Sequence, residues 1–200
     1  FDREACDVLR KFVKLKCALM PYLYRQAVKT HEEGIPLMRP MFLEFPGDRC
    51  CETLDKQYML GDSLLVAPVF KESGEVEYYL PKGNWVNLLT GKSYMGGGWQ
   101  KETHDYFTLP LLVRAGSIVP VGANCQRPDY DYADGVKLLL YFPDDGCEEE
   151  VFVTDVKGST AMKVRANRAG GTIKLRAEGR CGNFTCEVLG EEKLKVVLEG

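Results

Sequence analysis

Apolar residues recur at helical spacing between Arg3 and Glu33. Pro21 interrupts this pattern, and we expect it to kink or divide the helix, because proline lacks an amide donor and clashes with the preceding turn. Gly34 and Pro36 indicate where the helix ends, since glycine suits a left-handed cap and proline cannot continue a helix. The apolar positions that carry the pattern are Val8, Phe12, Leu15, Leu19, Leu23 and Ala27.

The segment 35–45 is apolar on both faces, apart from Arg39, Glu44 and two prolines. A strand with that pattern is usually buried on both sides, as in a parallel sheet or a barrel. A long helix followed by such a strand forms an α/β unit, and one unit cannot close a sheet. The chain begins at Phe1 without an initiator Met, so we expect a piece of a longer protein or a processed end.

Beyond Cys50 the pattern changes to short apolar runs that are separated by turn residues. The first group predicts strands at residues 63–70, 75–80 and 85–89, and a hairpin of 106–114 with 118–121. The polar, turn-rich segment 124–135 is expected to link two domains. The second group predicts strands at residues 136–142, 149–153, 161–166, 172–177, 184–188 and 194–198. Strands spaced about ten residues apart are typical of β-sandwiches, so two sandwiches are predicted.

The charge balance argues against some classes of partner. The 200 residues include 26 Lys and Arg against 29 Asp and Glu, which gives a formal net charge of −3. Without a general basic field, neither nucleic acid nor an anionic membrane surface is expected as the main partner. No apolar run approaches the roughly 20 residues that a helix needs to cross a bilayer, and the first residues show no secretory signal.

The eight cysteines favour reduced thiols over a disulfide framework or a metal site. Disulfide frameworks are typical of short secreted domains, and this chain is neither short nor visibly secreted. No Cys-x-x-Cys pair occurs, and His31 and His104 lie far from any cysteine pair, so no metal and no cofactor are predicted. Both histidines are expected at the surface rather than as bases. Reduced thiols favour a reducing compartment, here taken as a bacterial cytoplasm.

Candidate carboxylates are abundant, but no local pattern sets one apart as catalytic. Arg39 lies within an apolar run and must be paired, because an isolated buried charge is very costly. Its partner could be a substrate group or a structural carboxylate such as Glu44 or Asp48, and the structural pairing is favoured. Glu44 could instead point into a site at the end of a strand, although capping or ion pairing is the favoured interpretation.

Two further patterns leave a functional and a structural interpretation open. Asp129, Asp131 and Asp134 precede a glycine as in a calcium loop, but their spacing misses the EF-hand pattern, and a solvated linker is favoured. Tyr130 and Tyr132, with Trp85 and Trp99, could stack on sugar rings, whereas aromatic residues of small sandwiches more often belong to the core.

Several segments together resemble one enzyme family. Residues 39–46 (RPMFLEFP) and 55–69 (DKQYMLGDSLLVAPV) resemble the end of the catalytic barrel of glycoside hydrolase family 31, which includes α-glucosidases and α-xylosidases. Residues 78–85 (YYLPKGNW) and 109–118 (LPLLVRAGSI) resemble the proximal C-terminal sandwich of that family. Residues 124–130 (NCQRPDY) resemble its bacterial α-xylosidase branch. The resemblance is strong over residues 1–142 and weaker beyond.

The resemblance implies a mainly β chain: the terminal helix–strand unit of a (β/α)8 barrel, followed by two antiparallel β-sandwich domains. The barrel end would span residues 1–48, the proximal sandwich 49–123 and the distal sandwich 124–200. Arg39, Glu44 and Asp62 would then be structural residues at the end of the barrel.

The resemblance also implies a retaining α-glycosidase that hydrolyses terminal α-linked xylose or glucose from oligosaccharides. In this family both catalytic aspartates lie on earlier barrel strands, so the chain is expected to contain no catalytic or substrate-binding residue and to hydrolyse nothing alone. The oligosaccharide would bind through the barrel, and the full-length enzyme is expected to be a homo-oligomer. The alternative is an independent carbohydrate-binding or structural β-sandwich module, which would have no use for the helix–strand unit.

Overall fold

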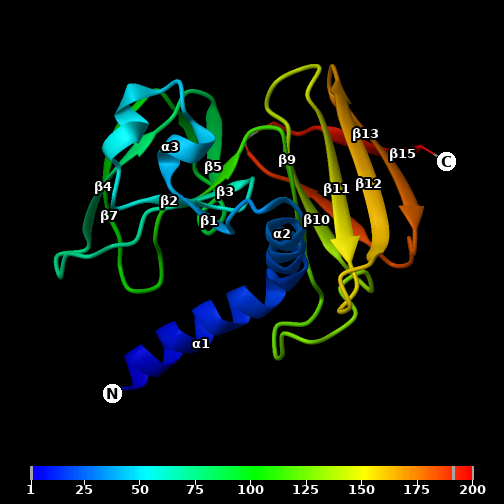
Figure 1. The fold of residues 1–200 in the computed structure, drawn as a ribbon, viewed down its shortest axis with the longest axis horizontal. Helices are drawn as coiled ribbons and strands as arrows, with labels where there is room; N and C mark the ends of the chain where they lie inside the picture. Colours follow the sequence, from blue (N-terminus) through cyan, green and yellow to red (C-terminus); the bar gives the residue numbers. More distant parts are fainter. Residues whose placement is uncertain (1, 191, 200) are drawn as a thin grey trace. The chain divides into compact units, whose positions relative to one another are not determined.

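The computed structural model describes residues 2–190 and 192–199. Their contacts form two compact units. Figure 1 colours the chain from blue at the N-terminus to red at the C-terminus. The central unit contains Pro36–Ala115, and the terminal unit contains Phe1–Ile35 with Gly116–Gly200. The three segments that the resemblance implies have different boundaries and stay a prediction about the longer protein.

Two helices open the terminal unit, α1 (Arg3–Ala18) and α2 (Met20–Glu33). The predicted division of the helix is confirmed, because Pro21 lies at the start of α2. The predicted cap is also confirmed, since Gly34 ends α2 with a φ of 74°. The side chain of Asp2 caps the start of α1. α2 packs against two strands, β9 (Ser117–Val121) and β11 (Glu148–Thr154), which places this helix in the terminal unit. No helix of the described residues has the length and apolar character needed to span a membrane.

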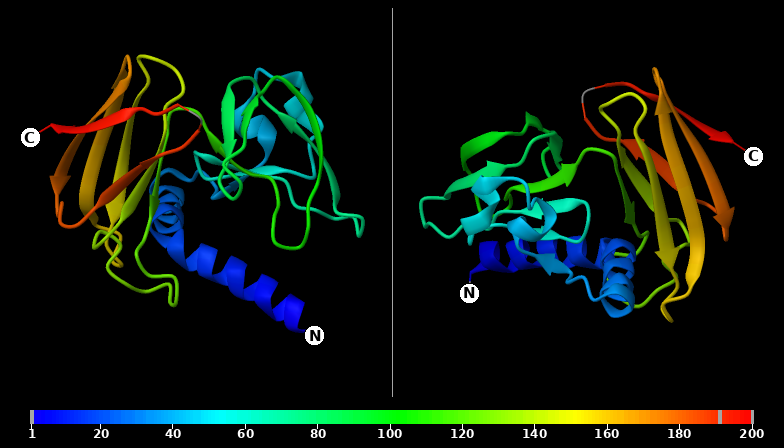
Figure 2. Two further views of the ribbon diagram at one scale, coloured as in Figure 1. Left: turned by 180° about the vertical axis from the view of Figure 1, so that it is seen from behind. Right: turned by 45° about the horizontal axis from the view of Figure 1, so that its top comes forward.

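Two sheets complete the terminal unit (Figures 1 and 2). The first has the order β14-β10-β9, and the second has the order β11-β12-β13-β15. The strands are β9 (Ser117–Val121), β10 (Lys137–Tyr141), β11 (Glu148–Thr154), β12 (Thr160–Ala169), β13 (Thr172–Gly179), β14 (Thr185–Val188) and β15 (Lys195–Glu199). The core joins Leu138 and Leu140 of one sheet to Met162, Val164 and Ile173 of the other, so the sheets pack face to face.

All six strands predicted beyond residue 135 are confirmed, but their pairing is not wholly antiparallel. β10 pairs with β14, and β13 with β15, in parallel. Parallel neighbours need a crossover connection rather than a tight turn, and here the chain runs through other strands before it returns. The segment 124–135 is not simply a solvated linker, because Tyr130 and Tyr132 are buried in the core.

The central unit also has two sheets (Figure 2). A six-stranded sheet has the order β1-β2-β3-β8-β5-β6, and β4 pairs with β7 in a two-stranded sheet. The strands are β1 (Met38–Arg39), β2 (Tyr58–Leu60), β3 (Leu64–Val66), β4 (Glu75–Leu80), β5 (Asn84–Asn87), β6 (Ser93–Met95), β7 (Gly98–Thr103) and β8 (Leu111–Arg114). Tyr78 and Leu80 of β4 share a core with Leu65, Trp85 and Leu112 of the larger sheet.

The buried strand predicted at residues 35–45 is wrong. Only β1 is extended, and it pairs antiparallel with β2 at an edge of the sheet. Pro40 follows and cannot donate to a ladder, so the chain turns into the short helix α3 (Met41–Glu44), with a 3₁₀ turn, η1 (Arg49–Thr53), beyond it. The expected helix–strand unit of a barrel is therefore not confirmed.

The hairpin predicted between residues 106–114 and 118–121 is also wrong. β8 pairs with β3 and β5, whereas β9 pairs with β10. β8 is thus held by two strands that precede it by more than 20 residues, whereas β9 pairs with the next strand along the chain. A local turn at Ala115 and Gly116 therefore did not specify which strands pair. The strand predicted at 63–70 ends early, at Val66, shortly before Pro68.

Candidate functional site

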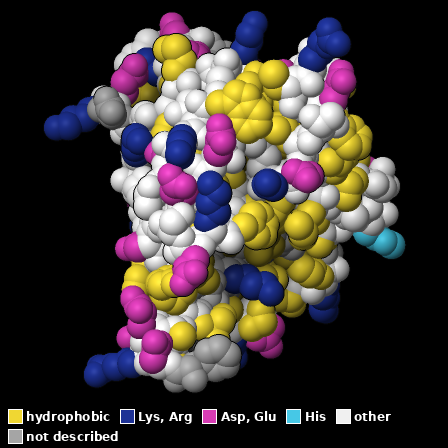
Figure 3. Space-filling view, turned by 90° about the vertical axis from the view of Figure 1, so that its left-hand side faces the viewer, with side chains coloured by type: hydrophobic (Ala, Val, Ile, Leu, Met, Phe, Trp, Pro, Cys, Tyr) yellow, Lys and Arg dark blue, Asp and Glu magenta, His cyan; other side chains and the backbone are white. Residues whose placement is uncertain are grey.

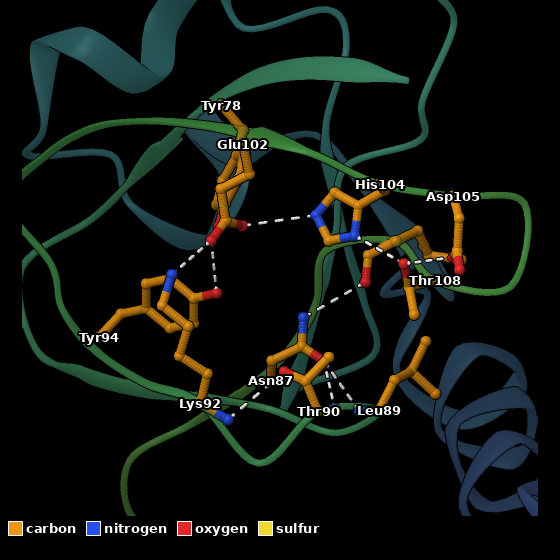
Figure 4. Close-up of polar contacts among 11 residues, drawn as sticks. Tyr78, Asn87, Leu89, Thr90, Lys92, Tyr94, Glu102, His104, Asp105 and Thr108 are labelled. Carbon is orange, nitrogen blue, oxygen red and sulfur yellow. Dashed lines mark hydrogen bonds and ion pairs between the residues drawn. The ribbon is translucent and has the colours of Figure 1, made fainter. Parts of the chain in front are cut away.

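A half-buried carboxylate, Glu102 of β7, is the centre of a polar cluster inside the central unit (Figure 4). Tyr78 of β4 donates its hydroxyl to Glu102 Oε2 at 2.8 Å. Tyr94 of β6 donates its hydroxyl to Glu102 Oε1 at 2.7 Å, and Lys92 Nζ donates to the same oxygen at 2.8 Å. Three residues are thereby tied to the Glu102 side chain: Tyr78 and Tyr94 from the two sheets, and Lys92 from the turn before β6.

These donors decide the ionisation of the cluster. Burial opposes the charge on Glu102, but the hydrogen bonds from Lys92, Tyr94 and Tyr78 outweigh it and lower the pKa of Glu102 to about 2. Burial, together with the bond to Glu102, raises the pKa of both tyrosines. A carboxylate that stays ionised at neutral pH, with hydrogen bonds to both oxygens, cannot serve as a general acid. The arrangement therefore stabilises the fold.

His104 extends this cluster, and its predicted surface position is wrong. Its side chain is 8% exposed, and Nε2 lies 3.5 Å from Glu102 Oε2 without a hydrogen-bond partner among the described residues. Nδ1 lies 3.1 Å from Thr108 Oγ1, and the Thr108 hydroxyl donates to Asp105 Oδ1 at 2.8 Å. The other histidine, His31, is exposed at the end of α2, as predicted.

A buried amide holds the turn beside this cluster (Figure 4). Asn87 Oδ1 accepts hydrogen bonds from the amides of Leu89 and Thr90 at 2.8 and 3.1 Å. Asn87 Nδ2 donates to the carbonyl of Leu109 at 3.3 Å. Asn87 thereby fixes the turn that carries Lys92 toward Glu102.

A second polar cluster surrounds Arg39, whose side chain is only 3% exposed. Arg39 Nη1 lies 2.6 Å from both Glu44 Oε1 and Asp62 Oδ1, and Arg39 Nε donates to the carbonyl of Pro36 at 2.9 Å. Burial lowers the pKa of Arg39, but the two carboxylates outweigh it, so the pKa is raised. Arg114 Nη1 lies 3.5 Å from Glu44 Oε2.

The structure thus brings together all three residues that the sequence singled out for a structural role. Asp48, the other partner considered for Arg39, instead accepts hydrogen bonds from the Tyr79 hydroxyl at 2.9 Å and the Cys50 amide at 3.1 Å. The role of Arg39, Glu44 and Asp62 at the end of a barrel stays a prediction.

The remaining candidates divide between core and surface. Trp85 is buried, and its indole donates to the Pro81 carbonyl at 3.0 Å, so it belongs to the core. Trp99 of β7 is 56% exposed. Asp131 forms two bonds with Arg180, at 2.7 and 2.9 Å. Within the described residues, no group of three or more His, Cys, Asp or Glu side chains could hold a metal ion.

Sequence reasoning missed the cluster of Glu102. The signal was the alternation along residues 98–103, in which Gln100 and Glu102 face inward while Trp99 and Lys101 face outward. An acid at an inward position of a strand needs several donors, which could have drawn attention to the tyrosines of the neighbouring strands.

Two family models match the chain one after the other. Residues 34–119 match the glycosyl hydrolase family 31 C-terminal domain, and residues 131–200 match the C-terminal domain of alpha-xylosidase YicI. Among curated proteins, an alpha-xylosidase of Emericella nidulans is 38% identical over 92% of the chain, and alpha-xylosidase XylQ of Lactiplantibacillus pentosus is 39% identical over 94%. The chain spans 25% of the length of each of these relatives.

Solved structures of family 31 enzymes are also similar to this chain. A family 31 dextranase of Flavobacterium johnsoniae is similar to 88% of the chain, with a TM-score of 0.77 and 28% identity, over 23% of its own length. A family 31 α-xylosidase of Xanthomonas citri is similar to 90% of the chain, with a TM-score of 0.71 and 27% identity, over 21% of its own length.

Proposed function

Because this chain belongs to the C-terminal region of glycoside hydrolase family 31, we propose that it is the non-catalytic part of a retaining α-glycosidase. The parent enzyme would hydrolyse terminal α-linked xylose or glucose from oligosaccharides. The observation that carries the proposal is the likeness to two α-xylosidases over more than nine-tenths of the chain. The same likeness favours xylose over glucose as the sugar removed.

The polar clusters support a structural role for the chain. Retaining hydrolysis uses two carboxyl groups about 5–5.5 Å apart, one as nucleophile and one as acid and base. Glu102 is saturated by donors, and Glu44 and Asp62 are engaged by one arginine. Because the family carries both catalytic aspartates on earlier barrel strands, the two aspartates of the parent enzyme would precede Phe1.

An apolar surface on the central unit supports contact with that preceding part. Met38, Phe42 and Leu43 are 58%, 53% and 45% exposed, although they flank the buried Arg39 and Met41. Neighbouring exposed apolar side chains of this kind mark surfaces that another part of a protein covers. The barrel would cover β1 and α3 in the parent enzyme, and the chain would brace it.

Three further expectations belong to the same proposal. The oligosaccharide would bind through the barrel, the parent enzyme would form a homo-oligomer, and it would act in the bacterial cytoplasm. The described cysteines are all free thiols, which accords with a reducing compartment.

The coding sequence upstream of Phe1 provides the test. We expect several hundred further codons that encode alternating strands and helices with two aspartates at strand ends. The product of that longer reading frame should hydrolyse an aryl α-xyloside and release xylose that is first detected as the α-anomer. A start codon immediately before Phe1 would overturn the proposal and favour an independent module.

A further inference from the structure

A groove of about 790 Å³ runs along the outer side of β4 and β7 in the central unit. Figure 3 views the molecule from the side on which β4 and β7 lie in Figure 1, and hydrophobic side chains gather on it among charged ones. The lining residues that matter for its chemistry are Thr53, Lys56, Gln57, Phe70, Glu77 and Trp99. The structural role proposed above gives none of these six residues a task.

Trp99 forms a flat, preoriented wall of the groove. Its ring is 56% exposed and meets the ring of Tyr79 edge-on, with centroids 5.7 Å apart and an angle of 63°. Tyr79 is itself fixed, because its amide donates to Gln57 Oε1 at 2.7 Å and its hydroxyl donates to Asp48 at 2.9 Å. Gln57 Nε2 returns a bond to the Tyr79 carbonyl at 2.8 Å. An exposed indole is thus held in place by a buried amide.

Several polar groups around Trp99 form no bond within the described part of the chain and are therefore free to bind a ligand. The indole N–H of Trp99 has no hydrogen-bond partner among the described residues. The exposed side chains of Lys56 and Glu77 likewise form no ion pair or hydrogen bond within the described part of the chain. Phe70, 74% exposed, adds a second aromatic ring to the lining. The groove therefore combines apolar faces with unengaged donors and with the unengaged carboxylates of Asp55 and Glu77.

This combination matches the chemistry of a sugar ring. A pyranose has an apolar face of C–H groups that can stack on an indole, and a rim of hydroxyls that can bond to amine, carboxylate and indole N–H groups. Ligand sites are typically apolar clefts with a few placed polar groups of this kind. The lining carries charges of both signs, with Lys56 and Lys71 beside Asp55, Glu75 and Glu77. Because no uniform field attracts an anion or a cation, the groove favours a neutral ligand.

We propose that this groove binds the pyranose rings of a neutral oligosaccharide, with Trp99 as the stacking platform and Lys56 and Glu77 as hydroxyl ligands. The proposal rests on the proposed function only for the choice of α-linked sugars as the probe. It concerns binding alone and includes no bond-breaking step.

The test is a titration of the complete 200-residue chain with isomaltotriose, followed by saturation-transfer NMR and by tryptophan fluorescence. We expect weak, saturable binding that Trp99→Ala lowers by about tenfold or more, which is the scale of loss when an aromatic side chain is removed from beneath a stacked nucleobase. Glu77→Gln should lower it less. Tyr106→Ala is the matched control, since Tyr106 is an exposed aromatic residue of the same unit that does not line the groove.

Sorbitol, an open-chain polyol without a ring face, should not compete with isomaltotriose. Binding that survives Trp99→Ala, or an intact chain that binds no isomaltotriose, would overturn the proposal. A groove that a second copy covers would appear as a dimer that Trp99→Ala dissociates, and this result would also overturn it. Hydrolysis is not part of the readout, so failure here leaves the proposed function to be judged by the reading frame and its activity.

Discussion

Arg39 Nη1 lies 2.6 Å from Asp62 Oδ1, although 23 residues separate the two in sequence. The bond ties β1 to the turn between β2 and β3, and Glu44 binds the same nitrogen at the same distance. Arg39 is almost completely buried, so its charge depends on these carboxylates.

Arg39→Met should therefore destabilise the central unit. Removing Arg39 leaves two carboxylates without their shared cation, but Asp62 is 42% exposed and Glu44 keeps a contact with Arg114. The cost should therefore stay below the roughly 3–5 kcal/mol that is typical of breaking a fully buried ion pair. Urea denaturation measures the loss. Adding Glu44→Gln to Arg39→Met should recover part of the lost free energy of unfolding, because the half-buried side chain at position 44 then carries no charge. A loss below about 1 kcal/mol for the single substitution would contradict this account of the cluster.

Glu102 should make the chain sensitive to acid. Its pKa falls from 4.5 to about 2 in the folded state, so its contribution to stability is present above pH 4.5. That contribution is lost as the pH falls from 4.5 towards 2, and it is on the order of 3 kcal/mol.

The free energy of unfolding of the wild type and of Glu102→Gln, measured from pH 7 to pH 2, tests this prediction. The gap between the two should narrow across that acid range. Glu72→Gln is the control, since Glu72 is exposed, and it should follow the wild type throughout. A gap that does not change with pH would mean that the charge of Glu102 is not what stabilises the cluster.

Gly96 should not tolerate a side chain. A Cβ there would lie 1.9 Å from the Pro81 carbonyl oxygen, which accepts the indole N–H of Trp85. We expect Gly96→Ala to cost about 1–3 kcal/mol, because the core must move to admit it. Gly98→Ala, where nothing lies within 4 Å of the new Cβ, should be neutral or slightly stabilising. Thermal melts of both variants test this prediction, and Gly96→Ala should melt at the lower temperature. Equal melting temperatures would contradict it.

Phe42→Asp should reveal the surface proposed to contact the barrel. In the 200-residue chain the substitution should change stability by less than about 0.5 kcal/mol, because Phe42 is exposed. In the longer protein the same aspartate would be buried without a partner and should cost about 2 kcal/mol or more. Denaturation of both proteins provides the comparison, and an equal effect in the two would argue that nothing covers α3.

The sequence predicted local structure well where apolar residues recurred with one clear period, either that of a helix or that of a strand. Alternation with turns located the strands beyond residue 135, and helical spacing with Pro21 and Gly34 located both helices. Strand pairing was harder to predict, because β8 pairs with the earlier strands β3 and β5 rather than with β9, which follows it directly. The strand predicted at 35–45 is wrong because apolar residues there face outward as well as inward without the alternation of a strand.

The candidate sites divide in the same way. A buried arginine needs carboxylate partners, so Arg39 and Glu44 could be named from the sequence, whereas Asp62 was named only from the family resemblance. Glu102 could not, because its partners Tyr78 and Tyr94 come from different strands and meet only through the packing of two sheets. The groove beside Trp99 likewise depends on the position of Tyr79 across the β4–β7 pair.

The central claim is that the chain supports an α-glycosidase without catalysing the reaction itself. The most direct measurement is the release of aryl alcohol from an aryl α-xyloside by the product of the whole reading frame, beside the purified 200-residue chain. We predict turnover by the longer protein and none by the chain above the buffer blank. Turnover by the 200 residues alone, or a longer protein inactive on both α-xyloside and α-glucoside, would contradict the account.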